Sequence, residues 1–167
     1  MSVERKYLGH FIDAAFDLTY ESPNYVRLGK YLEEFAVELN PDVSTTKNIL
    51  GEQNVTHSGY EVSSNADPHY YDYDDALSEK IMDIAQYRYT GDQCKTSVVD
   101  VLLKPGATAD AAPTVVWAWR EDAVIVPDSV GGDTTGIQTP FTVYRAGNRV
   151  KGTFNLSTKT FTPNAAG

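Results

Sequence analysis

The segment Leu32–Val62 reads LEEFAVELNPDVSTTKNILGEQNVTHSGYEV and contains two runs in which apolar and polar residues alternate. In the first run, Phe35, Val37 and Leu39 fall on one side of an extended chain, which predicts a half-buried β-strand. The second run, Val55–Val62, has the pattern of a returning strand. Together the two runs predict a long β-hairpin.

The residues between these two runs predict a loop. Asn40-Pro41-Asp42 should end the first strand, because proline has no amide hydrogen to donate and asparagine and aspartate favour turns. The expected loop covers residues 42–52 and is mostly polar, but Ile49 and Leu50 stand side by side near its end. Two adjacent apolar side chains in an exposed loop would need cover from another molecule.

Length and composition are those of one folded domain. The chain has 167 residues, of which 41% are hydrophobic and 22% charged, so we expect a single domain, 1–167, with its own core. The 23 acidic and 14 basic side chains give a net charge of −9, which argues against binding of nucleic acid through its phosphates. Because Cys94 is the only cysteine, no internal disulfide and no multi-cysteine metal site can form.

The sequence lacks the motifs of enzymes and of membrane proteins. It contains no GxSxG, GxxxxGK[ST] or GxGxxG, and its three histidines form no HxxxH or HExxH pair. We therefore expect no enzymatic activity and no cofactor. No apolar run reaches the roughly 20 residues of a membrane span, and the N-terminus lacks the apolar core of a signal peptide. We expect a protein made in the cytoplasm that binds no membrane.

A single helix is predicted from about Asp75 to Thr90. One apolar stripe at helical spacing should form its core face, and the residues of this stripe are Leu77, Ile81, Ile84 and Ala85. Asp75 and the aspartates before it suit a helix N-terminus, and Gly91 suits its end. We expect this helix to pack on the outside of a sheet.

The rest of the chain has the pattern of strands. Residues 98–103 are apolar on both faces, apart from Asp100, which predicts a central strand. Residues 141–145 and 150–154 are separated by Ala-Gly-Asn-Arg and are predicted to pair as a hairpin. The fold class predicted is therefore mainly β (α+β): a β-sandwich or barrel with one packed α-helix and a long protruding hairpin.

The segment 67–75 allows two interpretations. Its four aspartates and His69 could bind a divalent cation through oxygen ligands, but the spacing does not match an EF-hand. The alternative is that the aspartates cap the following helix and the tyrosines pack on the sheet. We favour the second interpretation and expect no metal site.

Aromatic residues suggest a different function. Eleven tyrosines and two tryptophans could provide a stacking platform for a sugar, and the candidate residues are Tyr70, Tyr71, Tyr73, Trp117 and Trp119. The two tryptophans, however, stand among valine and alanine, which favours a core or an interface. A carbohydrate-binding β-sandwich module of a phage or host surface protein is thus the alternative function.

Several stretches, taken in order, resemble the major tail (tail tube) proteins of long-tailed phages and related prophages. They are LEEFAVELNPDVSTTKNILGE with HSGYEV after it, DPHYYDYDDALSEKIMDI, and TGDQCKTSVVDVLL. The resemblance continues towards the C-terminal strands and so covers most of the chain. It implies a tail-tube-like fold and a structural role in a virion tail.

The resemblance also implies the partners and the assembly. Such subunits form hexameric rings that stack into a hollow tube around a tape-measure protein, and viral DNA later passes through the tube without specific binding. Further partners are the tail terminator and the distal tail or tip proteins, and assembly takes place in the host bacterial cytoplasm. The chain would then have an N-terminal arm (1–10), an inter-subunit loop (42–52) and a C-terminal tail (163–167).

Two sets of residues follow from this reading of the chain. The inter-subunit or inter-ring contact is expected at Lys47, Asn48, Ile49 and Leu50. The lumen is expected to be acidic and to include Glu34 and Glu38, which alternate with the apolar face of the first run. Repulsion between these carboxylates and phosphate would keep DNA mobile, with a range of about 10 Å at ~0.1 M salt.

Overall fold

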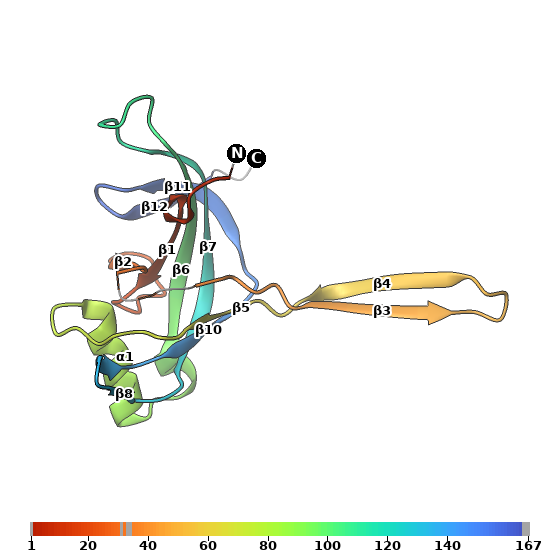
Figure 1. Cartoon of the computed structure of the whole chain (residues 1–167), viewed down its shortest axis with the longest axis horizontal. Coiled ribbons are helices and arrows are strands. Elements are labelled where there is room, and N and C mark those ends of the chain that lie inside the picture. The colour runs from red at the N-terminus through yellow and green to blue at the C-terminus, as the bar shows by residue number, and fades with distance from the viewer. Residues whose placement is uncertain (1, 31, 33–34, 165–167) are drawn as a thin grey trace.

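The computed structural model describes residues 2–30, 32 and 35–164, and its elements are mainly strands (Figure 1). In chain order they are η1 (Arg5–Tyr7), β1 (Leu8–Asp13), β2 (Tyr25–Arg27), β3 (Pro41–Lys47), β4 (Gln53–Tyr60), β5 (Ser63–Ala66), α1 (Ala76–Tyr87), η2 (Gly91–Cys94), β6 (Lys95–Lys104), β7 (Thr114–Pro127), β8 (Gly131–Asp133), β9 (Gly136–Gln138), β10 (Phe141–Arg145), β11 (Val150–Asn155) and β12 (Thr160–Pro163). This confirms the predicted mainly-β fold with one packed helix and a long protruding hairpin.

Strand β6 lies at the centre of the main sheet, whose strand order is β12-β11-β7-β6-β1-β2. Its side chains are buried on both faces: Val98 belongs to one hydrophobic cluster, and Val99 to a second cluster on the other face. The prediction of a central, doubly buried strand is therefore confirmed. Both clusters depend on β6, so the sheet has a core on each side.

The sheet divides along one edge of β7. Strand β10 pairs with the C-terminal part of β7, where Arg145 lies opposite Ala123, and β11 pairs with the N-terminal part, where Val150 lies opposite Arg120. The predicted hairpin between these two strands is wrong, because both lie end to end along the same edge. Strand β5 then adds to β10, and β12 adds to β11. The pair β10–β5 covers one face of the central strands, and the pair β11–β12 covers the opposite face.

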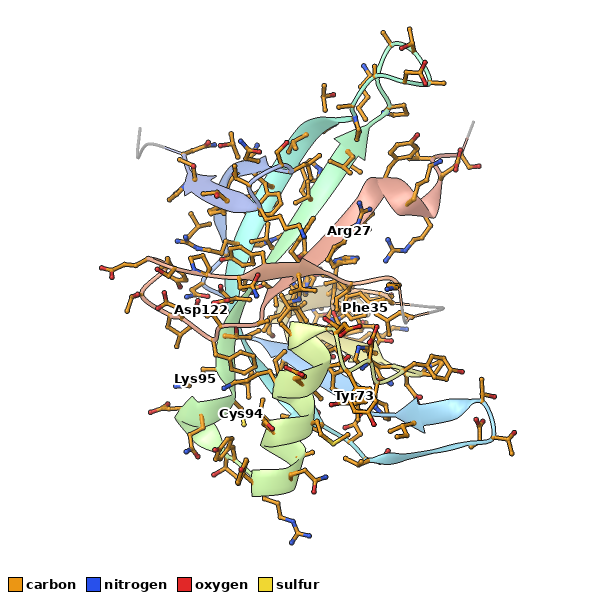
Figure 2. The ribbon with its side chains drawn as sticks, turned by 90° about the vertical axis from the view of Figure 1, so that its left-hand side faces the viewer. Arg27, Phe35, Tyr73, Cys94, Lys95 and Asp122 are labelled. Carbon is orange, nitrogen blue, oxygen red and sulfur yellow. The ribbon has the colours of Figure 1, made fainter. Side chains whose placement is uncertain are left out.

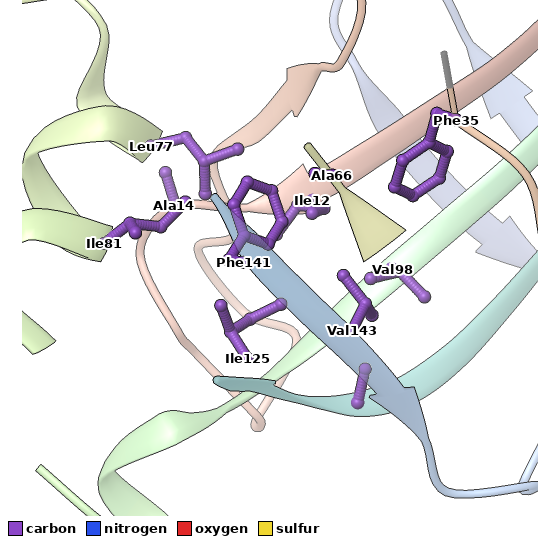
Figure 3. Packing of buried hydrophobic residues seen from close by; sticks show 11 residues of the cluster. Ile12, Ala14, Phe35, Ala66, Leu77, Ile81, Val98, Ile125, Phe141 and Val143 are labelled. Atoms are coloured by element: carbon purple, nitrogen blue, oxygen red, sulfur yellow. The ribbon is translucent and has the colours of Figure 1, made fainter. Parts of the chain in front are cut away.

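The helix α1 covers the first core. Seen from the side opposite the hairpin, it lies across the lower part of the sheet (Figure 2). Leu77 and Ile81 point from the helix towards Ile125 and Phe141 of β7 and β10 (Figure 3). Three members of the predicted core face, Leu77, Ile81 and Ile84, are fully buried, and Ala85 is half-buried.

The bounds of the helix differ from the predicted range. Asp75 is the N-cap, and its carboxylate accepts hydrogen bonds from Leu77 N (3.2 Å) and Ser78 Oγ (2.9 Å). The helix ends earlier than expected, because Arg88 adopts the left-handed conformation (φ 53°). Gly91, the predicted stop, instead begins the short helix η2.

The second core combines aliphatic and aromatic side chains, and its aromatic residues come from β1, β2, β11 and β12. Phe11 of β1 packs on Phe154 of β11 with ring centroids 4.6 Å apart. Residues 8–10 of the predicted N-terminal arm belong to β1 and pair with β6. At the other end, Pro163 is the last residue of β12, so the predicted tail begins one residue later, and residues 165–167 lie outside the described part of the chain.

Candidate functional site

The predicted first strand of the hairpin leaves the body instead of lying on it. Phe35 is buried, Val37 is half-buried and Leu39 is 52% exposed, so cover decreases steadily along the run. Its one ladder contact is an isolated bridge between Glu38 and Ser63, with hydrogen bonds of 2.8 and 3.0 Å. The alternation of this run predicts a half-buried strand, but of its three apolar residues only Phe35 reaches the core.

Asn40 turns the chain outwards. It adopts the left-handed conformation (φ 44°), and its side-chain amide donates to Glu61 O at 3.0 Å. Strand β3 starts at the next residue, Pro41, where the missing amide hydrogen is tolerated because proline is the first residue of the strand. The break is where the sequence predicted it, but a second, separate sheet follows it.

The prediction of a loop over residues 42–52 is wrong, because most of this segment belongs to strand β3. Strands β3 and β4 pair from Pro41–Tyr60 to Lys47–Gln53 and form a two-stranded sheet of their own. This hairpin projects far from the body (Figure 1). Its strands contain the β-branched residues Val43, Thr45, Thr46, Val55 and Thr56, which favour an extended backbone. Only residues 48–52 form a turn, and Lys47 is the last residue of β3.

The hairpin has two different faces. Directly paired residues point to the same side of a sheet, and the pairing register therefore separates two sets of side chains. The valine face carries Val43, Val55, His57 and Tyr60, and the rings of the last two meet edge to face at 4.6 Å. The hydroxyl face carries Ser44, Thr46, Asn54 and Thr56. Nothing in the described part of the body covers either face, since nearly every residue of β3 and β4 is exposed.

The tip of the hairpin is a turn closed by one asparagine. Asn48 Oδ1 accepts hydrogen bonds from Leu50 N and Glu52 N, each at 3.0 Å, and Gly51 supplies the positive φ (82°) that the turn requires. This geometry directs Ile49 and Leu50 outwards, with exposed fractions of 103% and 77%. Full burial of each side chain would be worth about 1.5–3 kcal/mol. The tip is therefore a strong candidate for a contact with another molecule. In the isolated subunit, Ile49 and Leu50 stay exposed and contribute no burial energy.

Inside the body, a buried charge network joins three strands. Asp100 of β6 accepts from Arg145 Nη1 (2.6 Å) and Nη2 (3.2 Å) and lies 2.7 Å from His10 Nδ1. Burial alone would raise the pKa of Asp100, but the bond to His10 and the charge of Arg145 outweigh it and hold this pKa below its ordinary value. These residues are 90 and 45 positions apart, and no local pattern in the sequence could have joined them.

The tautomer of His10 follows from its second neighbour. Arg5 Nη2 lies 3.0 Å from His10 Nε2, and a guanidinium can only donate. His10 therefore accepts at Nε2 and donates from Nδ1 to Asp100. Among the residues that the structure describes, none that bonds to this network has a nucleophilic side chain, and we interpret the network as a structural element.

The acidic segment 67–75 caps the helix. Asp75 is the cap itself, and Asp72 Oδ1 accepts from Asp74 N at 2.9 Å within the turn that precedes it. In the described ranges, no group of three or more His, Cys, Asp or Glu side chains is placed to hold a metal ion. His69 is buried beside Thr139 and Phe141, which accounts for its place in the core.

The aromatic residues do not gather into one platform. Trp119 of β7 is half-buried beneath Arg149 and Lys151, whose cationic groups lie 4.6 and 5.8 Å from its ring. Tyr70 lies elsewhere, bridged to Gln138 of β9, and Tyr71 and Tyr73 contact each other at 5.3 Å beside it in the chain. The tryptophans and tyrosines thus belong to separate regions of the body.

Of the two carboxylates predicted to face a lumen, Glu38 belongs to the described part of the chain. Glu38 is exposed at the base of the hairpin, while Glu34 lies outside the described residues. In the part of the chain that the structure describes, no helix has the length and apolar character to cross a membrane. Neither protein-family models nor curated protein sequences give a match to this chain.

Proposed function

We propose that this protein is a self-assembling structural subunit and, more specifically, the subunit of a phage tail tube. The observation that carries the proposal is the projecting hairpin, which exposes Ile49 and Leu50 at its tip. A two-stranded hairpin without further packing is at best marginally stable in water. A protein that extends such an element from its body needs a partner surface for it.

The partner has to be a separate molecule. Strand β3 has seven residues, and at roughly 3.4 Å per residue the tip lies about 24 Å from the hairpin base. Because the hairpin points away from the body (Figure 1), its tip cannot return to the surface from which it starts. A second copy of the chain is the simplest partner, since each copy then supplies one hairpin and one acceptor surface. Such a contact joins different patches and leads to rings or open stacks.

The tail-tube form of this proposal comes from the resemblance of the sequence. Hexameric rings would stack into a tube around a tape-measure protein, with the tail terminator and distal tail proteins at its ends. The net charge of −9 is compatible with DNA passing through such a tube without binding, because acidic surfaces repel phosphate. Glu38, which is exposed, is proposed to face the lumen.

The alternative of a carbohydrate-binding module has less support. A stacking platform needs an open aromatic face, whereas two cationic side chains cover Trp119. The exposed apolar residues of the hairpin are aliphatic at the tip, and aliphatic side chains cannot stack on a sugar as aromatic rings do. The hairpin is therefore better explained as a protein contact.

Negative-stain electron microscopy with light scattering across protein concentration tests the proposal. The purified protein should form rings or stacked tubes at high concentration, with or without a chelator. The double variant Ile49→Ser, Leu50→Ser should stay monomeric while keeping the circular dichroism of the wild type. A wild-type protein that is monomeric at every concentration and binds a cell-wall polysaccharide saturably would overturn the proposal in favour of the alternative.

A further inference from the structure

We infer that the hairpin tip of one copy docks into a basic groove on the body of a second copy. This groove, called here the Arg27 groove, is lined by the exposed basic residues Lys6, Arg27 and Lys30, which we call its rim. It is also lined by the more buried residues Leu28, Leu32 and Phe35, which we call its floor. The inference rests on the proposed self-assembly and names the surface that accepts the hairpin. The match between tip and groove in shape, charge and position supports it.

The size and floor of the groove suit the two side chains of the tip. Its volume is about 490 Å³, whereas a cavity of roughly 150 Å³ already holds a benzene-sized group. Leu28 and Leu32 are half-buried, so part of each side chain faces the groove. Ile49 and Leu50 are the exposed side chains that could fill it. The contact would remove apolar surface from water on both molecules.

The tip turn, residues 48–52, and the groove lining carry charges of opposite sign, although Lys47 precedes the turn and Glu4 pairs with Lys6 of the groove at 3.1 Å. Among the described residues that line the groove, every side chain with a permanent charge is an arginine or lysine. This is unusual for a protein whose net charge is −9. The tip carries the carboxylate of Glu52, held two residues from Leu50 by the bond from Asn48 Nδ2 to Glu52 Oε2 (3.1 Å). Docking of Leu50 would therefore bring Glu52 to the basic rim.

The positions of tip and groove favour a head-to-tail contact. Strand β2, which contributes Arg27, lies on the side of the body away from the hairpin (Figure 1). Arg27 and Phe35, both labelled in the view from that side (Figure 2), line the same groove. Each copy then offers its tip in one direction and its groove in the other. Each added copy leaves one tip unoccupied at one end of the assembly and one groove unoccupied at the other, so the contact can repeat.

Disulfide trapping tests the contact directly. Two forms of the protein, Leu50→Cys and Lys30→Cys, are each made in the Cys94→Ser background, one of them enlarged by a tag, and mixed under mild oxidation. The tagged–untagged dimer should form at least tenfold more than with Lys159→Cys as the groove partner, because Lys159 is exposed on the β11–β12 turn outside the groove. A Leu50–Leu50 homodimer as the main product, or equal trapping of Lys30→Cys and Lys159→Cys, would overturn the inference.

A charge exchange provides a second and independent test. Glu52→Arg and Arg27→Glu should each weaken assembly at least tenfold in light scattering, and an equimolar mixture should restore heterodimers. The pair Lys95→Glu, Lys159→Glu places acidic charge at exposed sites outside the groove and should assemble like the wild type. If the wild type assembles but neither groove variant weakens it, the tip docks elsewhere and only the inference fails. If the wild type neither assembles nor gives trapped dimers, the proposed function fails with it.

Discussion

His10 Nδ1 lies 2.7 Å from Asp100 Oδ1, and these two residues face each other directly across the paired strands β1 and β6. Both side chains are almost completely buried, as is Arg145, which closes the network from β10. Buried charges are costly unless each finds partners of opposite sign. The network thus stabilises one arrangement of three strands that are far apart in the sequence, at the point where the sheet divides.

Removal of the cation from this network should be strongly destabilising. Arg145→Ala would leave the buried carboxylates of Asp100 and Glu121 without their buried cation, and Asp100 would keep only His10 and the half-exposed Arg149, 4.0 Å away. We expect a loss of about 3–5 kcal/mol in the free energy of unfolding, measured by urea denaturation. Arg149→Ala is the matched control, because Arg149 is half-exposed and 4.0 Å from Asp100, and should cost less than about 1 kcal/mol. Equal losses in both variants would show that the network contributes little.

The core face of the helix can be tested at its centre. Ile81 is fully buried where α1 packs on β7 and β10. Ile81→Ala should therefore reduce the free energy of unfolding by about 2–5 kcal/mol. Asp83→Ala on the exposed side should change it by no more than about 0.5 kcal/mol. Assemblies formed by the remaining folded Ile81→Ala protein should keep the wild-type diameter in electron micrographs. A loss below 1 kcal/mol would contradict the packing described above.

The N-cap of the same helix has a matched control one residue away. Asp75→Ala removes the acceptor for Leu77 N and Ser78 Oγ, and should cost about 0.5–2 kcal/mol. Asp74→Ala removes an exposed carboxylate that makes no cap contact and should be within about 0.5 kcal/mol of the wild type. Thermal unfolding followed by circular dichroism would measure both, and a larger loss for Asp74→Ala would contradict the assignment of the cap.

His69 should make stability depend on pH. Burial lowers its pKa below the ordinary value of 6.5, although the nearby charge of Asp75 acts in the opposite direction. Between the folded and unfolded pKa values the unfolded chain binds more protons, so stability is full above pH 6.5 and decreases as the pH falls through this window. Urea midpoints between pH 5 and 8 should therefore fall more steeply for the wild type than for His69→Gln, which cannot be protonated. Parallel curves would show that His69 does not contribute.

Local patterns were sufficient to predict the helix and the central strand of the body. The stripe of Leu77, Ile81 and Ile84 identified the helix and its buried face, and the apolar run around Val98 and Val99 identified the central strand. In both cases the spacing of apolar residues in the sequence reflects which side chains are buried, and such spacing is what allows an element to be predicted. The predicted hairpin between β10 and β11 was wrong, because Ala-Gly-Asn-Arg can also connect two strands that lie end to end along the edge of a third strand, here β7. Only the length of β7, which offers partners to both strands, distinguishes the two arrangements.

The hairpin was predicted to exist but was placed too close to the body. Its register could not be read from the alternation at Phe35, Val37 and Leu39, because only Phe35 is packed in the core. The true strands, with Val43 and Val55, have no core face, and so their weak alternation looked like a polar loop. The Arg27 groove was not predicted at all, since its rim combines β2 and η1 with the segment that follows β2.

Hydrogen exchange of the hairpin amides, compared between dilute and concentrated protein, tests most directly whether this element is a contact between copies. In the free subunit the hairpin has no packing on the described body, so β3 and β4 amides should exchange far faster than those of β6. At concentrations where light scattering detects assembly, the amides of residues 43–56 should become at least tenfold more protected. Ile49→Ser, Leu50→Ser should show no such gain. Equal protection of the hairpin in free and assembled wild-type protein would contradict its role as the inter-subunit contact.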